Sequence, residues 1–188
     1  ISMLRGYDKI YFAFLFLVCS TNLASQSRES SLQEIIIAME EGNYITNSLY
    51  RTGLYSGPIQ KDSQYLLYDE LKECVSDEQI HNLISVQSPV VQYYSILIFM
   101  ARRPNQAMKF IFDNEQILKT KSVTNFLNYC QGFLNQRLID ALHFRIYDMI
   151  LEEEIDLSAR NLVRFLQLRE RRLGEASEER RISGDRGF

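Results

Sequence analysis

The segment that begins at Ser88 and Pro89 restricts the fold more than any other part of the chain. Serine caps free backbone N–H groups, and proline at the first helical position loses no hydrogen bond. The helix predicted over 90–101 is apolar almost all round. Its apolar residues are Val90, Val91, Tyr93, Tyr94, Ile96, Leu97, Ile98, Phe99 and Met100. Such a helix must be covered on most sides, so we expect it to lie inside a packed domain.

The rest of the chain after residue 31 also has the periodicity of helices. Further helices are predicted over 107–112, 124–134 and 138–151. Others are predicted after start signals at Ser31, Asp62, Ser76, Asn105 and Ser158. A short helix followed by a loop is expected over 44–58, and 114–122 is a mixed segment. No stretch shows sustained alternation of apolar and polar residues, so no strand is predicted.

These helices predict an all-α fold. Short turns between helices imply antiparallel neighbours, which gives antiparallel helical pairs in a short α-solenoid or an irregular bundle. The chain has 188 residues, which suggests one domain. We expect a signal-peptide-like segment over 1–25 and the helical domain over 26–173. The tail over 174–188 has no apolar period and is expected to be disordered.

The N-terminal segment has the pattern of an export signal. Arg5 and Lys9 precede an apolar run over 10–18, and small and polar residues follow it. The run is too short to cross a bilayer as a helix but fits the apolar core of a signal peptide. The alternative is a buried N-terminal helix. Cys19 stands where a bacterial lipoprotein carries its acylated cysteine, although the residues before it match a lipobox only loosely, so lipidation of Cys19 is a second expectation.

The segment around Ser88 is also similar to a known repeat. A helix containing Ile80 and Leu83, a tight polar turn, and Ser-Pro-Val-Val opening an apolar helix resemble the HEAT-repeat superfamily. The pattern is also similar to small secreted bacterial proteins with degenerate HEAT-like units. It departs at Gln92, where HEAT units often carry Arg or Lys. A weak echo of Glu78-Gln79-Ile80 recurs at residues 115–117, near the expected repeat length. The alternative is an irregular bundle without a repeat.

The composition argues against several classes of function. The net charge of −3 argues against nucleic-acid binding. Two histidines and three cysteines leave little material for a metal site or a nucleophile–base pair. The chain contains no phosphate-binding G-x-x-x-x-G-K, no H-E-x-x-H and no C-x-x-C motif. We therefore expect no cofactor, no metal and no small-molecule substrate.

Two pairs of reactive side chains are candidates for a catalytic or metal site. Asp140 and His143 share a helical face, but a di-iron bundle needs more such pairs, so His143 is expected at the surface or its boundary. Cys74 and His81 are separated by the capping box at Ser76, which breaks the helix between them, so His81 is expected to be solvated. Cys74 and Cys130 lie on apolar stripes. They would pair in an oxidising compartment, but we favour two buried thiols.

Clusters of charged residues and of tyrosines are the remaining candidates for a functional surface. The acidic residues over 152–156 are spaced differently from a calcium loop. A basic run occupies the last helix, and it comprises Arg160, Arg164, Arg169, Arg171 and Arg172. We expect a solvated, salt-bridged face there; the alternative is a strip that contacts anionic lipid. The tyrosines of the first third are expected to fill helix interfaces rather than a recognition surface, and they are Tyr44, Tyr50, Tyr55, Tyr65 and Tyr68.

The favoured function is therefore an exported, small helical-repeat protein that acts by protein–protein contact, with no catalysis. Helical arrays offer extended surfaces rather than pockets, and no catalytic constellation is evident in the sequence. The expected location is periplasmic, envelope-associated or secreted. The first alternative is a lipid-anchored or membrane-peripheral envelope protein that uses Cys19. The second is a small enzyme of unfamiliar type, which a pocket containing Asp140 and His143 would favour.

Overall fold

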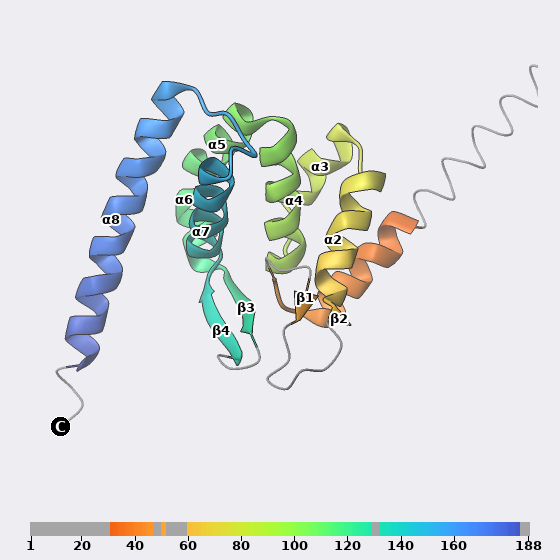
Figure 1. Ribbon diagram of the computed structural model, residues 1–188, viewed down its shortest axis with the longest axis horizontal. Helices are drawn as coiled ribbons and strands as arrows, with labels where there is room; N and C mark the ends of the chain where they lie inside the picture. Colours follow the sequence, from red (N-terminus) through yellow and green to blue (C-terminus); the bar gives the residue numbers. More distant parts are fainter. Residues whose placement is uncertain (1–30, 47–49, 52–59, 129–131, 185–188) are drawn as a thin grey trace, which may run out of the picture.

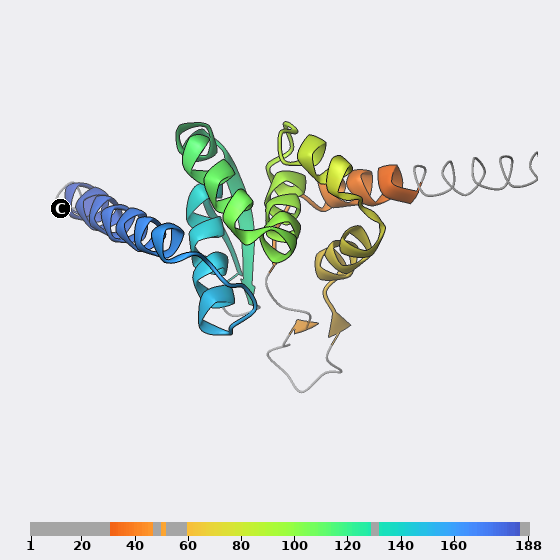
Figure 2. The same cartoon turned by 90° about the horizontal axis from the view of Figure 1, so that it is seen from above.

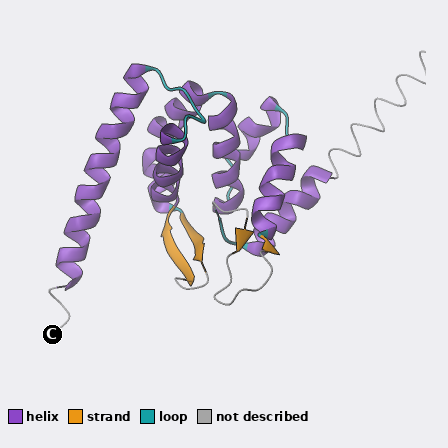
Figure 3. Cartoon of the chain, viewed as in Figure 1, coloured by secondary structure: helices purple, strands orange, loops and turns teal. Residues whose placement is uncertain are grey.

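The computed structural model describes residues 31–46, 50–51, 60–128 and 132–184. It is mainly helical, as predicted, with short antiparallel strands added to the helices (Figure 3). A first helix covers residues 31–42. The other elements are, in chain order, β1 (Tyr50–Arg51), β2 (Gln60–Lys61), α2 (Ser63–Cys74), α3 (Asp77–Leu83), α4 (Pro89–Arg102), α5 (Pro104–Asp113), α6 (Glu115–Thr120), β3 (Ser122–Asn128), β4 (Gly132–Arg137), α7 (Leu138–Leu151) and α8 (Ala159–Gly184).

The helices follow one another along the long axis of the molecule (Figures 1 and 2). The helix over 31–42 and α2 lie at one end, α4 is central, and α8 lies at the other end. α4 packs against α3, α5 and α7, while α7 also packs against α6, and α8 packs on α5. Neighbours in the sequence are therefore mostly neighbours in space.

Helix α4 forms the centre of the hydrophobic core. Every residue from Val90 to Met100 is buried, which confirms that this apolar helix is covered on most sides. Two of its buried polar side chains, Gln92 and Tyr94, form hydrogen bonds, whereas Ser95 Oγ has no partner among the described residues. The Gln92 amide donates to the Ile84 carbonyl oxygen at 2.6 Å, and its oxygen accepts from Lys121 Nζ at 2.7 Å. The Tyr94 hydroxyl accepts from the Thr46 N–H at 2.9 Å. These bonds offset the cost of placing polar atoms in the core.

Two of the predicted helix starts are confirmed in detail. The Asp62 carboxylate accepts from the N–H groups of Gln64 and Tyr65 at 2.9 and 3.4 Å, so it caps α2. Ser76 and Gln79 form both bonds of the capping box that opens α3. Each cap satisfies backbone donors that a helix leaves free, and this fixes where α2 and α3 begin.

Two other predicted caps are wrong. α4 begins at Pro89 as expected, but the Ser88 side chain makes no capping hydrogen bond. Asn105 does not cap α5, because Pro104 already occupies the first turn of that helix. The Asn105 side-chain oxygen instead accepts from the Ser158 N–H at 2.9 Å and from Asn161 Nδ2 at 2.8 Å. Asn105 thus ties the start of α8 to α5.

The expectation that the chain contains no strand is wrong. The helix predicted over 124–134 is replaced by the hairpin of β3 and β4, in which Ser122 pairs with Arg137 and Phe126 with Phe133. The apolar residues over 126–134 have helical spacing, but the turn of a hairpin also brings them together across two strands. The β-branched Val123 and Thr124 favour the extended form at the start of the segment.

Residues 44–46 are extended, so the short helix expected from residue 44 is not present there. Ile45 forms an isolated parallel bridge with Asn125, and its N–H donates to the Thr124 carbonyl oxygen at 2.8 Å. Ile45 is fully buried. The hairpin therefore connects the N-terminal part of the chain to the helices that follow α4.

Helix α8 is longer than predicted. It continues to Gly184, so the disorder expected from residue 174 is wrong for 174–184. The sequence over 175–181 consists largely of Glu, Ala and Arg, which have high helix propensity. A helix can therefore continue there without an apolar stripe to bury. Residues 185–188 of the predicted tail and residues 1–25 of the predicted export signal lie outside the described residues.

Gly42 ends the first helix where α2 comes closest. A Cβ on Gly42 would overlap the side-chain amide of Gln64, which is buried and donates to the Met39 carbonyl oxygen at 3.2 Å.

Gly42→Ala is therefore expected to lower the free energy of unfolding by about 1–3 kcal/mol, measured by urea denaturation. The matched control is Gly174→Ala in α8, where no atom lies within 4 Å of the added Cβ. This control should stabilise the protein by up to about 1 kcal/mol. A Gly42→Ala variant as stable as the parent would contradict the close packing of Gly42 on Gln64.

Candidate functional surface

The arginines of the predicted basic run on α8 contact different helices. Arg172 is buried, and its guanidinium donates to Asp140 Oδ1 on α7 at 2.6 Å. Arg137 donates to the other oxygen of Asp140 at 2.7 Å. Burial raises the pKa of Asp140, but the hydrogen bonds from Arg172 and Arg137 outweigh it and leave that pKa below its usual value. Asp140 is thus the ionic anchor of α8 rather than a free carboxylate.

His143 lies one turn further along α7, and the expectation of a surface or boundary position is wrong. Its ring is buried and packs edge-on against Phe165 of α8, with the ring centres 5.6 Å apart. Its Nε2 has no hydrogen-bond partner among the residues that the structure describes. Burial lowers the pKa of His143 to about 4, and the nearby Arg172 lowers it further while Asp140 opposes the change. The imidazole is therefore neutral at pH 7 and part of the α7–α8 contact.

The buried imidazole predicts a specific pH dependence of stability. In the unfolded chain histidine titrates near 6.5, so between pH 6.5 and about 4 the unfolded state binds a proton that the folded state does not. The free energy of unfolding should fall across this window by a few kcal/mol as the pH decreases, while the contribution is fully present above pH 6.5. Urea denaturation at a series of pH values measures this slope.

His143→Leu should remove that slope, since leucine does not titrate. His81→Gln is the matched control, because His81 is the other histidine of the chain and is exposed. The control should keep the parent's slope. If His143→Leu and the parent lose stability equally between pH 6.5 and 4, the neutral buried imidazole is refuted.

Two other arginines of α8, Arg164 and Arg171, face a groove on α5 and α6. Six residues line it, and they are Phe112, Glu115, Arg164, Gln167, Leu168 and Arg171. The groove has a volume of about 290 Å³. Arg164 lies 4.1 Å above the centre of the Phe112 ring, and Arg171 pairs with Glu115 at 3.1 Å. We call this the α8 groove; it combines an apolar floor with two cationic side chains.

A second groove lies on α3, α4 and α5. It has a volume of about 240 Å³ and contains Asp77, His81 and Arg103. Asp77 pairs with Arg102 and Arg103 at 3.1 Å each, and these hydrogen bonds lower the pKa of its carboxyl. His81 is exposed, as predicted, with its ring against Phe99. Asp140 and His143, the pair considered as a catalytic site, line neither of these two grooves.

The remaining candidates have structural partners. The acidic residues Glu152 and Glu154 both pair with Arg145, at 3.3 and 2.8 Å. Cys74 is half-buried at the end of α2, and its thiol donates to the Leu71 carbonyl oxygen at 3.6 Å. Burial raises the pKa of this thiol, which keeps it protonated at neutral pH. Cys19 and Cys130 lie outside the described residues.

The tyrosines of the first third are mostly interface residues, as expected. The Tyr44 hydroxyl donates to Asp62 at 3.2 Å. Tyr68 is half-buried between Tyr65 and Tyr94, with ring centres 5.9 and 5.3 Å away. Burial raises the pKa of Tyr68 to about 12. The Tyr55 position and the side chain of Tyr50 lie outside the described part of the chain.

Exposed apolar side chains gather near α8. Among the described residues, nine large apolar side chains are exposed. Five of them belong to α7 and α8, namely Phe144, Leu151, Val163, Leu166 and Leu173. Val163, Leu166 and Leu173 stay exposed because α8 is covered on one side only. Several exposed apolar residues on neighbouring helices are typical of a contact surface.

The described residues contain no group of three or more His, Cys, Asp or Glu side chains that would hold a metal ion. Within the same ranges, no helix combines the length and apolar character that crossing a bilayer requires. No family model, curated protein or solved structure matches this chain.

Sequence reasoning found the arginines of α8 but not the surface they form. Arg160, Arg164 and Arg171 recur at intervals of four and seven residues, so they share one helical face. Arg169 and Arg172 lie on another face, where Arg169 covers the Tyr147 ring at 3.9 Å. Sorting the five arginines by helical face would have shown that they form two sets. The contributions of Phe112 and Glu115 have no signal in the sequence, because they depend on the packing of α5 and α6 against α8.

Proposed function

We propose that this protein is an interaction module that binds a protein partner through α8. The observations that carry the proposal are the α8 groove and the exposed apolar residues Val163, Leu166 and Leu173 of the same helix. Apolar contacts supply affinity, and the arginines at the rim favour a partner with acidic side chains. No catalytic step is proposed.

We also propose that the helices form a short, degenerate HEAT-like array. The packing of α3 on α4 and of α6 on α7 supports two helical pairs in sequence. The hairpin of β3 and β4 separates α6 from α7, so the second pair departs from a regular unit. Lys121 reaches Gln92 at 2.7 Å and so brings a cation to the position where HEAT units often carry one.

Two variants test the interaction surface. Tagged parent protein is used to capture partners from the envelope and soluble fractions of the source cells, and the captured proteins are identified by mass spectrometry. A protein partner, either a different protein or an untagged second copy of this chain, should be retained by the parent and lost by Val163→Asp/Leu166→Asp. Ile117→Asp is the control, because Ile117 is exposed on α6 outside the α8 groove. Capture that is equal for all three proteins, or a parent that retains neither a different protein nor a second copy of this chain, overturns the proposal.

Export is proposed on the N-terminal pattern alone. The apolar run over 10–18, followed by small and polar residues, supports a cleaved signal. Cys19 directly after this run favours lipid anchoring as a second candidate. Mass spectrometry of the mature N-terminus separates them: a chain that begins after Cys19 supports cleavage and excludes the anchor, while an acylated Cys19 supports the anchor. A mature chain that retains residues 1–18 refutes both.

A further inference from the structure

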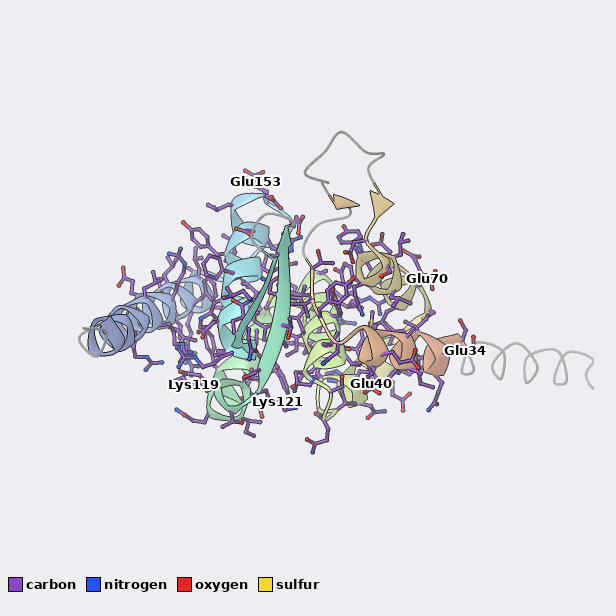
Figure 4. All side chains as sticks on the ribbon, turned by 90° about the horizontal axis from the view of Figure 1, so that it is seen from below. Glu34, Glu40, Glu70, Lys119, Lys121 and Glu153 are labelled. Carbon is purple, nitrogen blue, oxygen red and sulfur yellow. The ribbon has the colours of Figure 1, made fainter. Side chains whose placement is uncertain are left out.

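The two ends of the helical array carry opposite charge. At one end, the helix over 31–42 and α2 contain six carboxylates and one lysine, Lys72. The carboxylates are Glu34, Glu40, Glu41, Asp69, Glu70 and Glu73. All six are exposed, and none pairs with a cation among the described residues. Figure 4 shows Glu34, Glu40 and Glu70 at this end of the molecule, far from α8. We call this surface the acidic end.

The acidic end also has exposed apolar side chains. Ile37 lies between Glu34 and Glu41 on the helix, at intervals of three and four residues, and is 48% exposed. Leu66 precedes Asp69 and Glu70 on α2 and is 37% exposed. Each of the two helices thus presents one apolar side chain surrounded by negative charge. Such a surface suits a partner that is both apolar and basic.

The opposite end, formed by α8, has that character. Residues 159–174 contain five arginines and one glutamate. Arg160, Arg164 and Arg171 are exposed, and Arg160 contacts no carboxylate in the described chain. The exposed apolar residues Val163 and Leu166 lie on the adjoining outer face. We call the exposed part of this segment the basic end.

We infer that the partner of α8 is a second copy of this chain, whose acidic end docks on the basic end in a head-to-tail contact. The inference rests on the proposed function, because it names the occupant of the same surface. Opposite charges favour contacts between unlike ends, while contacts between two acidic or two basic ends are repulsive. Because the ends lie at opposite extremes of the array, each copy would leave one end free for the next (Figure 1). Repetition gives an open chain of copies or a ring.

A pair of blocked variants tests this arrangement in the full chain. The acid-blocked variant is Glu34→Lys/Glu40→Lys/Glu70→Lys, and the base-blocked variant is Arg160→Glu/Val163→Glu. These side chains are exposed and without ion pairs among the described residues, so both variants should fold. Sedimentation velocity at low salt measures the mass over a series of concentrations. Glu78→Lys on α3 is the control for a charge reversal away from both ends.

The parent and Glu78→Lys should grow beyond dimers with concentration, and salt should weaken the growth. Each blocked variant alone should stay monomeric. An equimolar mixture of the two should stop at dimers, because one intact acidic end and one intact basic end remain. A parent that stays monomeric or stops at dimers, or a blocked variant that assembles alone, overturns the inference. Capture of a different protein through Val163 and Leu166 would still support the proposed function, so the two failures are distinguishable.

Discussion

Val91→Asp is expected to unfold the protein or to leave it with a small fraction of its stability. Val91 is fully buried on α4, among residues that are buried on every side of the helix. An aspartate there would lose its hydration without a cation in reach, or would have to bind a proton. The cost is about 4 kcal/mol or more, against a total of about 5–15 kcal/mol for a typical domain. Far-ultraviolet circular dichroism during urea denaturation measures the loss.

The matched control is Val163→Asp, the same substitution at a side chain of α8 that is 54% exposed. Its effect on the free energy of unfolding should lie within about 0.5 kcal/mol. Similar losses for both variants would show that aspartate lowers helix stability in general. A Val91→Asp variant that melts like the parent would mean that α4 is not the centre of the core.

Asp140→Asn should have the second largest effect. It leaves the buried Arg172 without its carboxylate and removes the bond from Arg137. Removing one partner of a buried pair costs about 3–5 kcal/mol, and because Asp140 keeps 27% of its side-chain surface exposed we expect about 3 kcal/mol. Urea denaturation measures the loss, and faster proteolysis between residues 152 and 158 should report release of α8.

Asp156→Asn is the control, because Asp156 is exposed in the connection between α7 and α8 and has no ion pair among the described residues. It should be nearly neutral. The lowered pKa of Asp140 also sets a pH window: its contribution is fully present above the unfolded pKa of about 4 and is lost as the pH falls through the lower folded pKa. Equal stability of parent and Asp140→Asn at pH 7 would refute the anchoring role.

Local signals in the sequence predicted the helices well where capping and periodicity agreed. Pro89, Asp62 and the capping box at Ser76 fix helix starts through backbone groups within a few residues, and α7 has the predicted bounds. The hairpin was missed because its stability depends on pairing across the turn and on the bridge from Ile45. Such contacts join distant residues and leave no periodic pattern within either segment.

The environment of His143 was mispredicted for a related reason. A single helical face shows which residues lie together, but not which helix will cover that face. Phe165 and Arg172 of α8 cover His143 and Asp140, and this contact follows from the return of the chain past α5. The sequence therefore predicted the basic run of α8, whereas the pairing of Arg171 with α6 and of Arg172 with α7 depends on how these helices pack.

The bridge between Ile45 and Asn125 has a consequence for folding kinetics. In a simple stack of helical pairs, each unit contacts only its neighbours, and the ends can open separately. Here a buried backbone bond from Ile45 to Thr124 closes a large loop that encloses α2 to α6. Closing that loop lowers the entropy of the chain before the stabilising contacts between its ends have formed. We therefore expect this step to be slow and to follow helix formation. Once it is closed, the two halves should unfold in one cooperative transition.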